Sequence, residues 1–281
     1  MTAPPRDRER ALAFIRAHDR ALADRVETFA WGEALLTPSL PLVHDANFLL
    51  VHALPRRVGA AELAHEGERV MGGAGLGHRR VNVDDEATAG RLASQFAERG
   101  WEHEQFLVMS LQTGPDRAVD SSVAHEIDPE LLLGMRAESI RAWRPDERLV
   151  EQLLALDARR RDVTEVRAFA VLVDGHPVSH AYLYRDGPDG AVAQVEDVAT
   201  LPEHRGRGYA RAVVTRAAQA AAGAEFVFLV TSATDWPQHL YRKLGFEAVG
   251  TEDRFLSRSR ADLRLRRPRR GFRARDRSPN G

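Results

Sequence analysis

The sequence predicts an α+β fold in which a mostly antiparallel sheet is flanked by helices. Short apolar runs typical of strands, helix patterns with clear start signals, and tight glycine turns between strands support this prediction. From Val123 onward these signals follow the order β-α-α-β-β-β-α-β-α-β. Strands joined directly by short turns pair antiparallel. The carboxy-terminal half is therefore expected to form one α+β unit.

The amino-terminal half is expected to form a second α+β domain. A helix is predicted over about Pro5–Arg25, because Leu12, Ile15, Leu22 and Val26 give an apolar stripe at helical spacing. The elements expected after it are strands at Glu33–Leu36, Phe48–Val51, Arg79–Val83 and Glu104–Ser110, with helices at Ala60–Met71 and Asp85–Arg99.

The elements of the carboxy-terminal half have strong local signals. A strand at Val123–Ile127 is followed by two helix starts, Asp128-Pro129-Glu130 and Pro145-Asp146-Glu147, which combine acidic residues with proline. Asp174-Gly175 predicts a turn between two strands. The later elements are strands at Val166–Val173, Val178–Tyr184, Ala191–Ala199, Phe226–Val230 and Phe246–Gly250, and helices at Tyr209–Ala222 and Trp236–Leu244.

A polar segment and a basic tail divide the chain. We expect an amino-terminal domain over 1–112, a linker over 113–122, a second domain over 123–256, and a disordered Arg-rich tail over 257–281. From Leu256 the chain has about ten Arg against two Asp, so this end carries about +8 and the remainder about −9. Contact with nucleic acid is one interpretation, but Phe272 is the only aromatic residue there, which favours a solvated end.

Composition excludes several classes of protein. No apolar run reaches the roughly 18–20 residues of a membrane span, and the first ten residues lack the apolar core of a signal peptide. A cytoplasmic protein without membrane contacts is therefore expected. The chain has no cysteine, which excludes disulfides, thiolate metal sites and a cysteine nucleophile. We expect no metal site, since no cluster of metal-ligand residues is visible.

The segment Val195–Ala210 predicts an anion-binding site. An expected strand ends in a turn with two glycines, and a helix begins directly afterwards. Backbone N–H groups of such a turn and the positive end of the helix dipole attract anions. Gly206 and Gly208 leave room for close approach, and Arg205 and Arg207 suit phosphate. The turn therefore predicts a diphosphate ligand; it is neither a P-loop nor a dinucleotide fingerprint.

Two motifs in this half resemble those of the GNAT acetyltransferase superfamily. Its acyl-CoA pyrophosphate loop is similar to Arg205-Gly206-Arg207-Gly208-Tyr209-Ala210, and its closing signature is similar to Leu240-Tyr241-Arg242-Lys243-Leu244-Gly245-Phe246. The motifs occur at the family's spacing and within its order of elements, over residues 118–256. The resemblance implies the GNAT fold, with acetyl-CoA as co-substrate and no metal.

The resemblance also implies roles for individual residues. Pantetheine would lie along the strand that ends with Val198, Ala199 and Thr200, and the pyrophosphate would bind Arg205, Gly206, Arg207, Gly208, Tyr209 and Ala210. A backbone N–H near Val198 would stabilise the tetrahedral oxyanion. Tyr241 corresponds to the general acid that protonates the departing thiolate; alternatively, it is a packing aromatic beside Phe246.

A base is needed because the amine must react in its neutral form. Glu196 and Asp197 are the nearest carboxylates in the sequence. Adjacent residues of a strand point to opposite faces, so only one of the two is expected to face the cleft. The sequence leaves open which of them it is.

The amino-terminal half resembles the middle of the same fold more weakly. His78-Arg79-Arg80-Val81-Asn82-Val83 is followed by a helix, Gly100-Trp101 and a strand. In place of the glycine loop we expect Asp84–Gly90, whose three acids would repel a pyrophosphate. Tandem GNAT proteins often keep one active and one silent copy, and the silent copy can shape the acceptor pocket. A degenerate GNAT copy without cofactor is thus one interpretation, and an unrelated α+β packing domain is the other.

The predicted function is an acetyl-CoA-dependent N-acetyltransferase that acts on a primary amine of a small molecule or peptide N-terminus, by direct attack in a ternary complex. The acidic body favours a cationic amine. One alternative is a non-catalytic acyl-CoA sensor whose Arg tail contacts nucleic acid, but a sensor has no need of the proton donor Tyr241. A purely structural role is disfavoured by the intact glycine loop.

Overall fold

The computed structural model describes residues 5–186 and 190–258. The predicted disordered tail lies almost entirely outside them. In the amino-terminal half the elements are α1 (Pro5–Leu22), β1 (Arg25–Phe29), β2 (Gly32–Leu36), β3 (Phe48–Val51), α2 (Ala60–Gly67), β4 (Arg79–Val83), α3 (Glu86–Glu98) and β5 (Glu102–Leu111). In the carboxy-terminal half they are β6 (Ala124–Ile127), α4 (Leu133–Trp143), α5 (Glu147–Val163), β7 (Glu165–Val173), β8 (His176–Asp186), β9 (Val192–Thr200), α6 (Tyr209–Ala220), β10 (Phe226–Ser232), α7 (Pro237–Lys243) and β11 (Phe246–Ser257).

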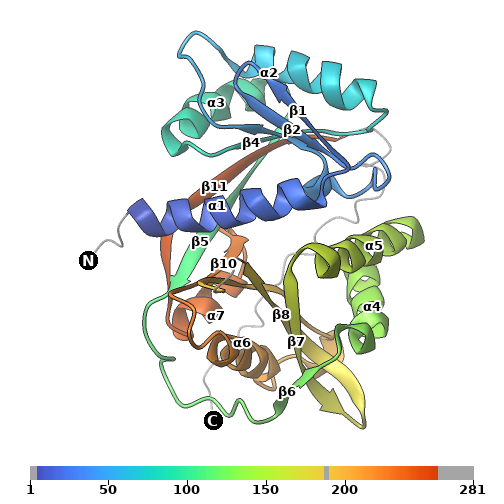
Figure 1. The fold of residues 1–281 in the computed structure, drawn as a ribbon, viewed down its shortest axis with the longest axis vertical. Coiled ribbons are helices and arrows are strands. Elements are labelled where there is room, and N and C mark those ends of the chain that lie inside the picture. The colour runs from blue at the N-terminus through green and yellow to red at the C-terminus, as the bar shows by residue number, and fades with distance from the viewer. Residues whose placement is uncertain (1–4, 187–189, 259–281) are drawn as a thin grey trace, which may run out of the picture.

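One continuous sheet runs through both halves of the described chain (Figure 1). Its strand order is β1-β2-β3-β4-β11-β5-β10-β9-β8-β7-β6. Neighbouring strands pair antiparallel except at β3–β4 and β9–β10, which pair in parallel. The predicted α+β architecture with a mostly antiparallel sheet flanked by helices is therefore confirmed.

The two halves repeat one order of elements. The series β2, β3, α2, β4, α3, β5 corresponds to β8, β9, α6, β10, α7, β11, and in each series the parallel pair encloses the first helix. The last strands are exchanged, because β5 pairs with β10 and β11 pairs with β4. This geometry supports a second copy of the same fold. Since each exchanged strand pairs with a strand of the other half, the sheet does not mark a boundary at residue 112, and the proposed domain limits stay a prediction.

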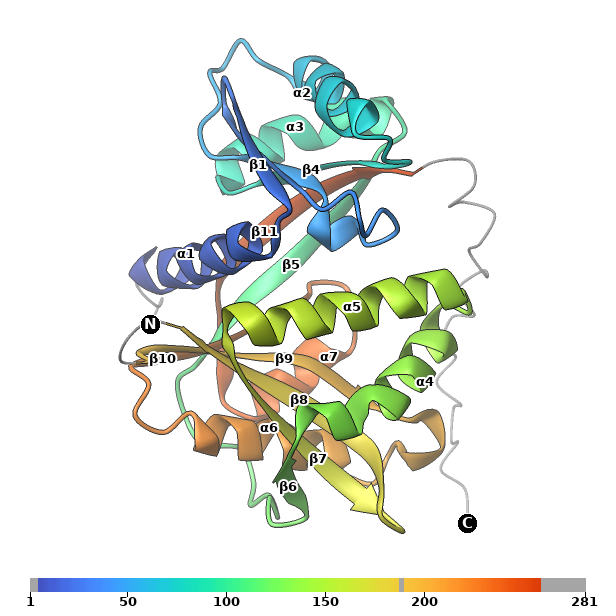
Figure 2. The same ribbon diagram turned by 45° about the vertical axis from the view of Figure 1, so that its right-hand side comes forward.

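Helix α1 lies across the junction of the halves (Figures 1 and 2). Its buried residues Ala11, Leu12 and Phe14 pack against the sheet of the carboxy-terminal half, and the Phe14 ring meets Phe228 edge-on at a centroid distance of 5.5 Å. Burying these side chains ties the first element of the chain to β8–β10. The amino-terminal helix is thus part of the wall between the halves.

The helix predicted over Pro5–Arg25 is shorter than expected. It ends at Leu22, and Arg25–Phe29 forms β1, which makes a tight hairpin with β2. Val26, taken as part of the apolar stripe, is 42% exposed. The Asp24 carboxylate accepts hydrogen bonds from Ser39 Oγ and Arg159 at 2.7 Å each, which holds the chain away from a further helical turn.

None of the helices within residues 5–186 and 190–258 has the length and apolar character needed to cross a membrane.

Candidate active site

The strands β9 and β10 pair over a short stretch and then separate. They pair only from Val192 to Gln194, opposite Phe226 to Phe228. Further along, β9 pairs with β8 alone. A bulge interrupts that pairing too, because the step from Tyr182 to His180 on β8 spans three residues on β9. The bulge contains Asp197, whose φ of 50° is rare for a residue with a side chain.

The glycine turn after β9 is open to approach. Gly206 and Gly208 have φ values of 78° and 84°, and a Cβ at either position would meet no atom within 4 Å. Gly208 is the N-cap of α6, and no side chain caps this end of the helix. Residues 205–208 are exposed, and Arg205 Nε donates a hydrogen bond to Thr200 O at 3.1 Å. Uncapped amides at the start of a helix are groups that attract anions, so the geometry is compatible with the predicted anion site, which stays a prediction.

The remaining candidate cofactor residues lie at the end of β9 and at the start of α6. Val198, Tyr209 and Ala210 pack against the core cluster that contains Tyr241. Ala199 packs against the cluster on the opposite face, and the Thr200 hydroxyl lies 2.8 Å from Ser179 Oγ. Residues of the diverging strand, of the start of α6 and Tyr241 therefore share one hydrophobic cluster.

Tyr241 is almost buried on α7, with 8% of its surface exposed. Its ring meets Phe246 at a centroid distance of 6.3 Å, as the packing interpretation requires. Burial and then the charge of Glu196 raise the pKa of the Tyr241 hydroxyl above its usual value. Tyr241 therefore keeps its proton at neutral pH and lies within electrostatic reach of Glu196.

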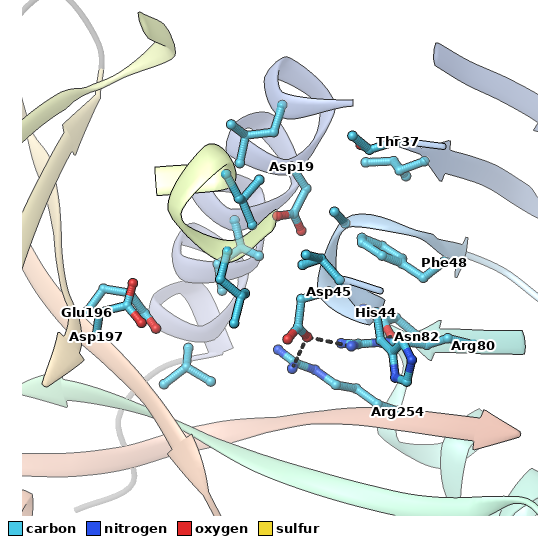
Figure 3. Close-up of a pocket in the computed structure, with 18 of the residues that line it drawn as sticks. Asp19, Thr37, His44, Asp45, Phe48, Arg80, Asn82, Glu196, Asp197 and Arg254 are labelled. Carbon is cyan, nitrogen blue, oxygen red and sulfur yellow. Dashed lines mark hydrogen bonds and ion pairs between the residues drawn. The ribbon is translucent and has the colours of Figure 1, made fainter. Parts of the chain in front are cut away.

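Glu196 and Asp197 both line one cavity of about 430 Å³ between the halves, as Figure 3 shows. The two side chains therefore do not point to opposite faces as expected, and which of them faces the cofactor cleft stays a prediction. Strict alternation of side chains holds for a regular strand, whereas the bulge at Asp197 breaks it.

The two carboxylates have opposite electrostatic surroundings. Asp197 lies 3.3 Å from Arg136 Nη1 and 3.2 Å from Arg160 Nη1. Burial opposes its ionisation, but these two cations hold the pKa of Asp197 below its usual value. For Glu196, burial and then the charge of Asp197 raise the pKa to about 7. Gln194 Nε2 donates a hydrogen bond to Glu196 Oε2 at 2.5 Å.

The cavity contains residues that sequence reasoning missed. Helix α1 contributes His18 and Asp19, and α5 contributes Arg160. The sequence of this amphipathic, Arg-rich helix gave no specific signal for His18 and Asp19. Tyr241 and the glycine turn do not line this cavity. The predicted cofactor residues and the cavity therefore have only the strand β9 in common.

Among the described residues, no group of three or more His, Asp or Glu side chains is arranged to hold a metal ion.

Comparison with known families identifies the domain. Residues 134–246 match the family described as the acetyltransferase (GNAT) family. The match runs from α4 to the start of β11 and includes the glycine turn and Tyr241. This part of the chain is therefore a GNAT acetyltransferase domain, which confirms the resemblance seen in its two motifs.

Solved structures resemble the chain over both halves. A functionally unknown conserved protein from Staphylococcus epidermidis matches with a TM-score of 0.63 and 12% identity, over 84% of this chain and 94% of that one. A GCN5-related N-acetyltransferase from Kribbella flavida matches with a TM-score of 0.61 and 18% identity, over 95% and 100%. One from Sphaerobacter thermophilus matches with a TM-score of 0.55 and 17% identity, over 81% and 76%. These likenesses show the fold alone. No curated protein sequence matches the chain.

Proposed function

We propose that the protein transfers the acetyl group of acetyl-CoA to a primary amine of a small molecule or peptide N-terminus. The observation that carries the proposal is the open glycine turn beside diverging strands, since it offers uncapped amides to a pyrophosphate and a cleft to the pantetheine. Acetyl-CoA would bind along Val198–Thr200 and on Arg205–Ala210, as the resemblance implies.

The acceptor would enter the cavity on the other side of β9. Its amine nitrogen attacks the thioester carbon in a ternary complex, the C–S bond breaks, and the products are an amide and CoA. A proton leaves the amine, and a proton is gained by the sulfur. A backbone N–H near Val198 would stabilise the oxyanion that forms in between.

Glu196 is the better candidate for the base. With its pKa near 7 it exchanges protons at neutral pH, whereas Asp197 is held ionised by two arginines. Asp197 would act instead as the group that positions Arg136 and Arg160.

Tyr241 would donate the proton to the departing thiolate. A protonated phenol is a suitable donor, because a thiol has a pKa of about 8.5 and its anion needs only a weak acid. A non-catalytic acyl-CoA sensor, the alternative, would need neither a proton donor such as Tyr241 nor a base with a pKa near 7.

The experiment that tests the proposal is a CoA-release assay with a panel of primary amines, preceded by calorimetric titration of acetyl-CoA. Binding at one site per chain together with amine-dependent CoA release is expected. Binding without release for any amine would favour the sensor, and no binding would refute the proposed cofactor site.

A further inference from the structure

Most charges in the cavity between the halves are already paired. Asp45 pairs with Arg80 and Arg254, and Asp197 pairs with Arg136 and Arg160. Two more lining carboxylates also have arginine partners, Glu252 with Arg254 at 2.7 Å and Glu104 with Arg258 at 3.4 Å. A ligand therefore finds little uncompensated charge at these positions.

Two lining carboxylates differ from the rest. Within the described residues, neither Asp19 nor Glu196 has an Arg, Lys or His nitrogen within 4.0 Å. Glu196 has a hydrogen bond from Gln194, whereas the Asp19 side chain has none. Burial and then the charge of Glu252 raise the pKa of Asp19 to about 7. A cation placed beside Asp19 would compensate this half-buried carboxylate.

His18, the neighbour of Asp19, stacks against the Tyr184 ring but lacks hydrogen-bond partners among the described residues. It is 8% exposed and lines the cavity, and among the described residues neither ring nitrogen has a hydrogen bond. Burial and then the charge of Arg160 lower the pKa of His18 to about 4, so the ring is neutral. A neutral imidazole offers an acceptor nitrogen to an N–H group of a ligand.

The wall of the cavity is otherwise rich in aliphatic side chains. Ile15, Leu22, Leu153, Leu156 and Val230 line it. Figure 3 shows Asp19 on a different side of the cavity from Glu196. A volume of about 430 Å³ lies in the range of small-molecule sites. The cavity thus combines two carboxylates that lack cationic partners with an apolar space.

We infer that the acceptor is an aliphatic amine with a second cationic group, such as a diamine, whose reacting nitrogen approaches Glu196 while its second cation binds Asp19. The carbon chain would lie against the aliphatic wall, and His18 would accept a hydrogen bond from the second group. This inference rests on the proposed function and adds to it the substrate class and the recognition residue.

The test compares acceptors of matched length. Straight-chain diamines are assayed beside the monoamine and the ω-amino acid of the same chain length. Over the best-fitting length, kcat/KM for the diamine should exceed that for the monoamine roughly 10- to 100-fold, as expected for a hydrogen bond between charged groups. The advantage should appear in KM, because the second cation contacts no reacting atom.

Asp19→Asn should remove most of the preference for the diamine and raise KM for it towards the monoamine's value. Asp7→Asn is the matched control, because Asp7 lies on the same helix but does not line the cavity. Calorimetric titration of the diamine into both variants repeats the comparison without turnover. A urea unfolding curve shows whether each variant is folded.

Three results would overturn the inference. They are equal kcat/KM for diamines and monoamines in the wild type, an unchanged preference in Asp19→Asn, or preference for the ω-amino acid, which would assign recognition to Arg80 and Arg254. In each case acetylation of some amine would leave the proposed function standing. If no amine is acetylated and no diamine binds, both proposals fail.

Discussion

The loops that follow β3 and β9 occupy corresponding places in the two halves, yet they differ in their backbone amides. After β9, Gly208 is uncapped and surrounded by open space. After β3, Glu62 Oε2 accepts a hydrogen bond from Gly59 N at 2.9 Å and Gln95 Oε1 accepts one from Ala60 N at 3.0 Å. A Cβ on Gly59 would lie only 2.5 Å from Gln95 Oε1. One loop presents free donors to an anion, and the other has satisfied them internally.

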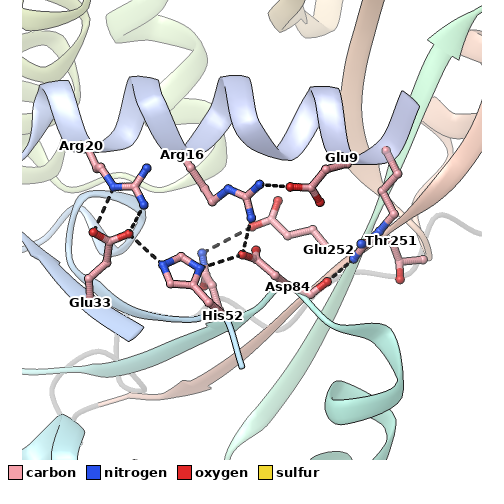
Figure 4. Close-up of polar contacts among 10 residues, drawn as sticks. Glu9, Arg16, Arg20, Glu33, His52, Asp84, Thr251 and Glu252 are labelled. Carbon is pink, nitrogen blue, oxygen red and sulfur yellow. Dashed lines mark hydrogen bonds and ion pairs between the residues drawn. The ribbon is translucent and has the colours of Figure 1, made fainter. Parts of the chain in front are cut away.

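The two parallel strand pairs, β3–β4 and β9–β10, also differ, since the first stays paired to its end and the second does not. β3 stays paired with β4 as far as Val51 and Val83, and Asp84 N continues the ladder with a bond to Val51 O at 3.2 Å. Figure 4 shows that side chains also join the two strand ends, since His52 Nδ1 lies 3.2 Å from Asp84 Oδ2. Arg16 and Arg20 of α1 reach into this network, pairing with Asp84 and Glu33. β3 and β4 therefore stay joined at the point where β9 and β10 have separated.

The comparison teaches that one order of elements supports both an open and a closed site. The difference lies in a few side chains that cap amides and in whether two parallel strands stay paired. It also corrects the sequence prediction, which placed the degenerate loop at Asp84–Gly90. The parallel pairing puts the corresponding loop after β3, at residues 52–59. That the amino-terminal half binds no cofactor stays a prediction, now supported by its capped amides.

The largest expected effect is the loss of acetyl-CoA binding in Gly208→Glu. A side chain at φ 84° strains the turn, and its charge repels the pyrophosphate. Losing two charge-assisted hydrogen bonds of about 1.5–3 kcal/mol each would weaken binding roughly a thousandfold. Calorimetry measures the affinity, and Gly208→Ala gives the cost of strain without charge.

The matched change in the other half is Arg57→Glu, in the loop after β3. It should leave acetyl-CoA affinity and the stoichiometry of one per chain unchanged. Two sites in the wild type, or weaker binding in Arg57→Glu, would contradict the contrast between the loops.

Tyr241→Phe should lower kcat about 100-fold, because the departing thiolate loses its proton donor. Acetyl-CoA affinity should not change, since the ring still packs against Phe246. Steady-state kinetics and calorimetry together separate these effects. Unimpaired turnover would leave Tyr241 with its packing role alone.

Glu196→Gln should lower kcat/KM roughly 10- to 100-fold and remove a pH dependence. In the wild type, kcat/KM should rise as the pH passes through about 7, because the base acts in its deprotonated form. The pH profile is measured with saturating acetyl-CoA. A wild-type profile that is flat between pH 6 and 8 would assign the base elsewhere.

Asp197→Asn is the comparison for Glu196→Gln and should act mainly through stability. It leaves Arg136, which is 8% exposed, with one carboxylate partner in place of two. A destabilisation of about 1–3 kcal/mol in urea unfolding is expected. If Asp197→Asn kept its stability but lost the pH dependence of kcat/KM, Asp197 would be the base and Glu196 the structural carboxylate.

Local signals predicted most of the fold and the position of the glycine turn. Phe48–Val51 and Arg79–Val83 were predicted to the residue, because each is a short buried strand between turn signals. Gly206 and Gly208 have open space beside them, as the prediction of close approach requires, and both take positive φ values that glycine tolerates. These features depend on the residues themselves and their immediate neighbours.

Features that depend on distant contacts were missed. Phe246–Gly250 was predicted as the beginning of the last strand, but its extension to Ser257 was not, because pairing with β4 and β5 fixes that part. Asp19 enters the cavity only because α1 crosses between the halves. The shared orientation of Glu196 and Asp197 comes from a bulge, which propensities do not show. Tertiary pairing decides each of these cases.

The smallest expected effect contrasts Glu196 with Glu33, a carboxylate of the closed strand ends. Burial and Asp197 raise the folded pKa of Glu196 from 4.5 to about 7, so the folded chain binds this proton more tightly than the unfolded chain. Stability from this group is therefore lost as pH rises from about 4.5 to 7. For Glu33, the effect of burial is outweighed by Arg20 and His52, which lower the pKa. The contribution of Glu33 to the stability of the fold is therefore present above pH 4.5 and lost at lower pH.

At pH 8, Glu196→Gln should stabilise the protein by roughly 1–2 kcal/mol and Glu33→Gln should destabilise it by a similar amount. Urea unfolding at pH 5 and pH 8 measures the free energy of unfolding of both variants. If both substitutions changed it in the same direction at pH 8, the proposed difference between Glu196 as a destabilising base and Glu33 as a stabilising structural carboxylate would be wrong.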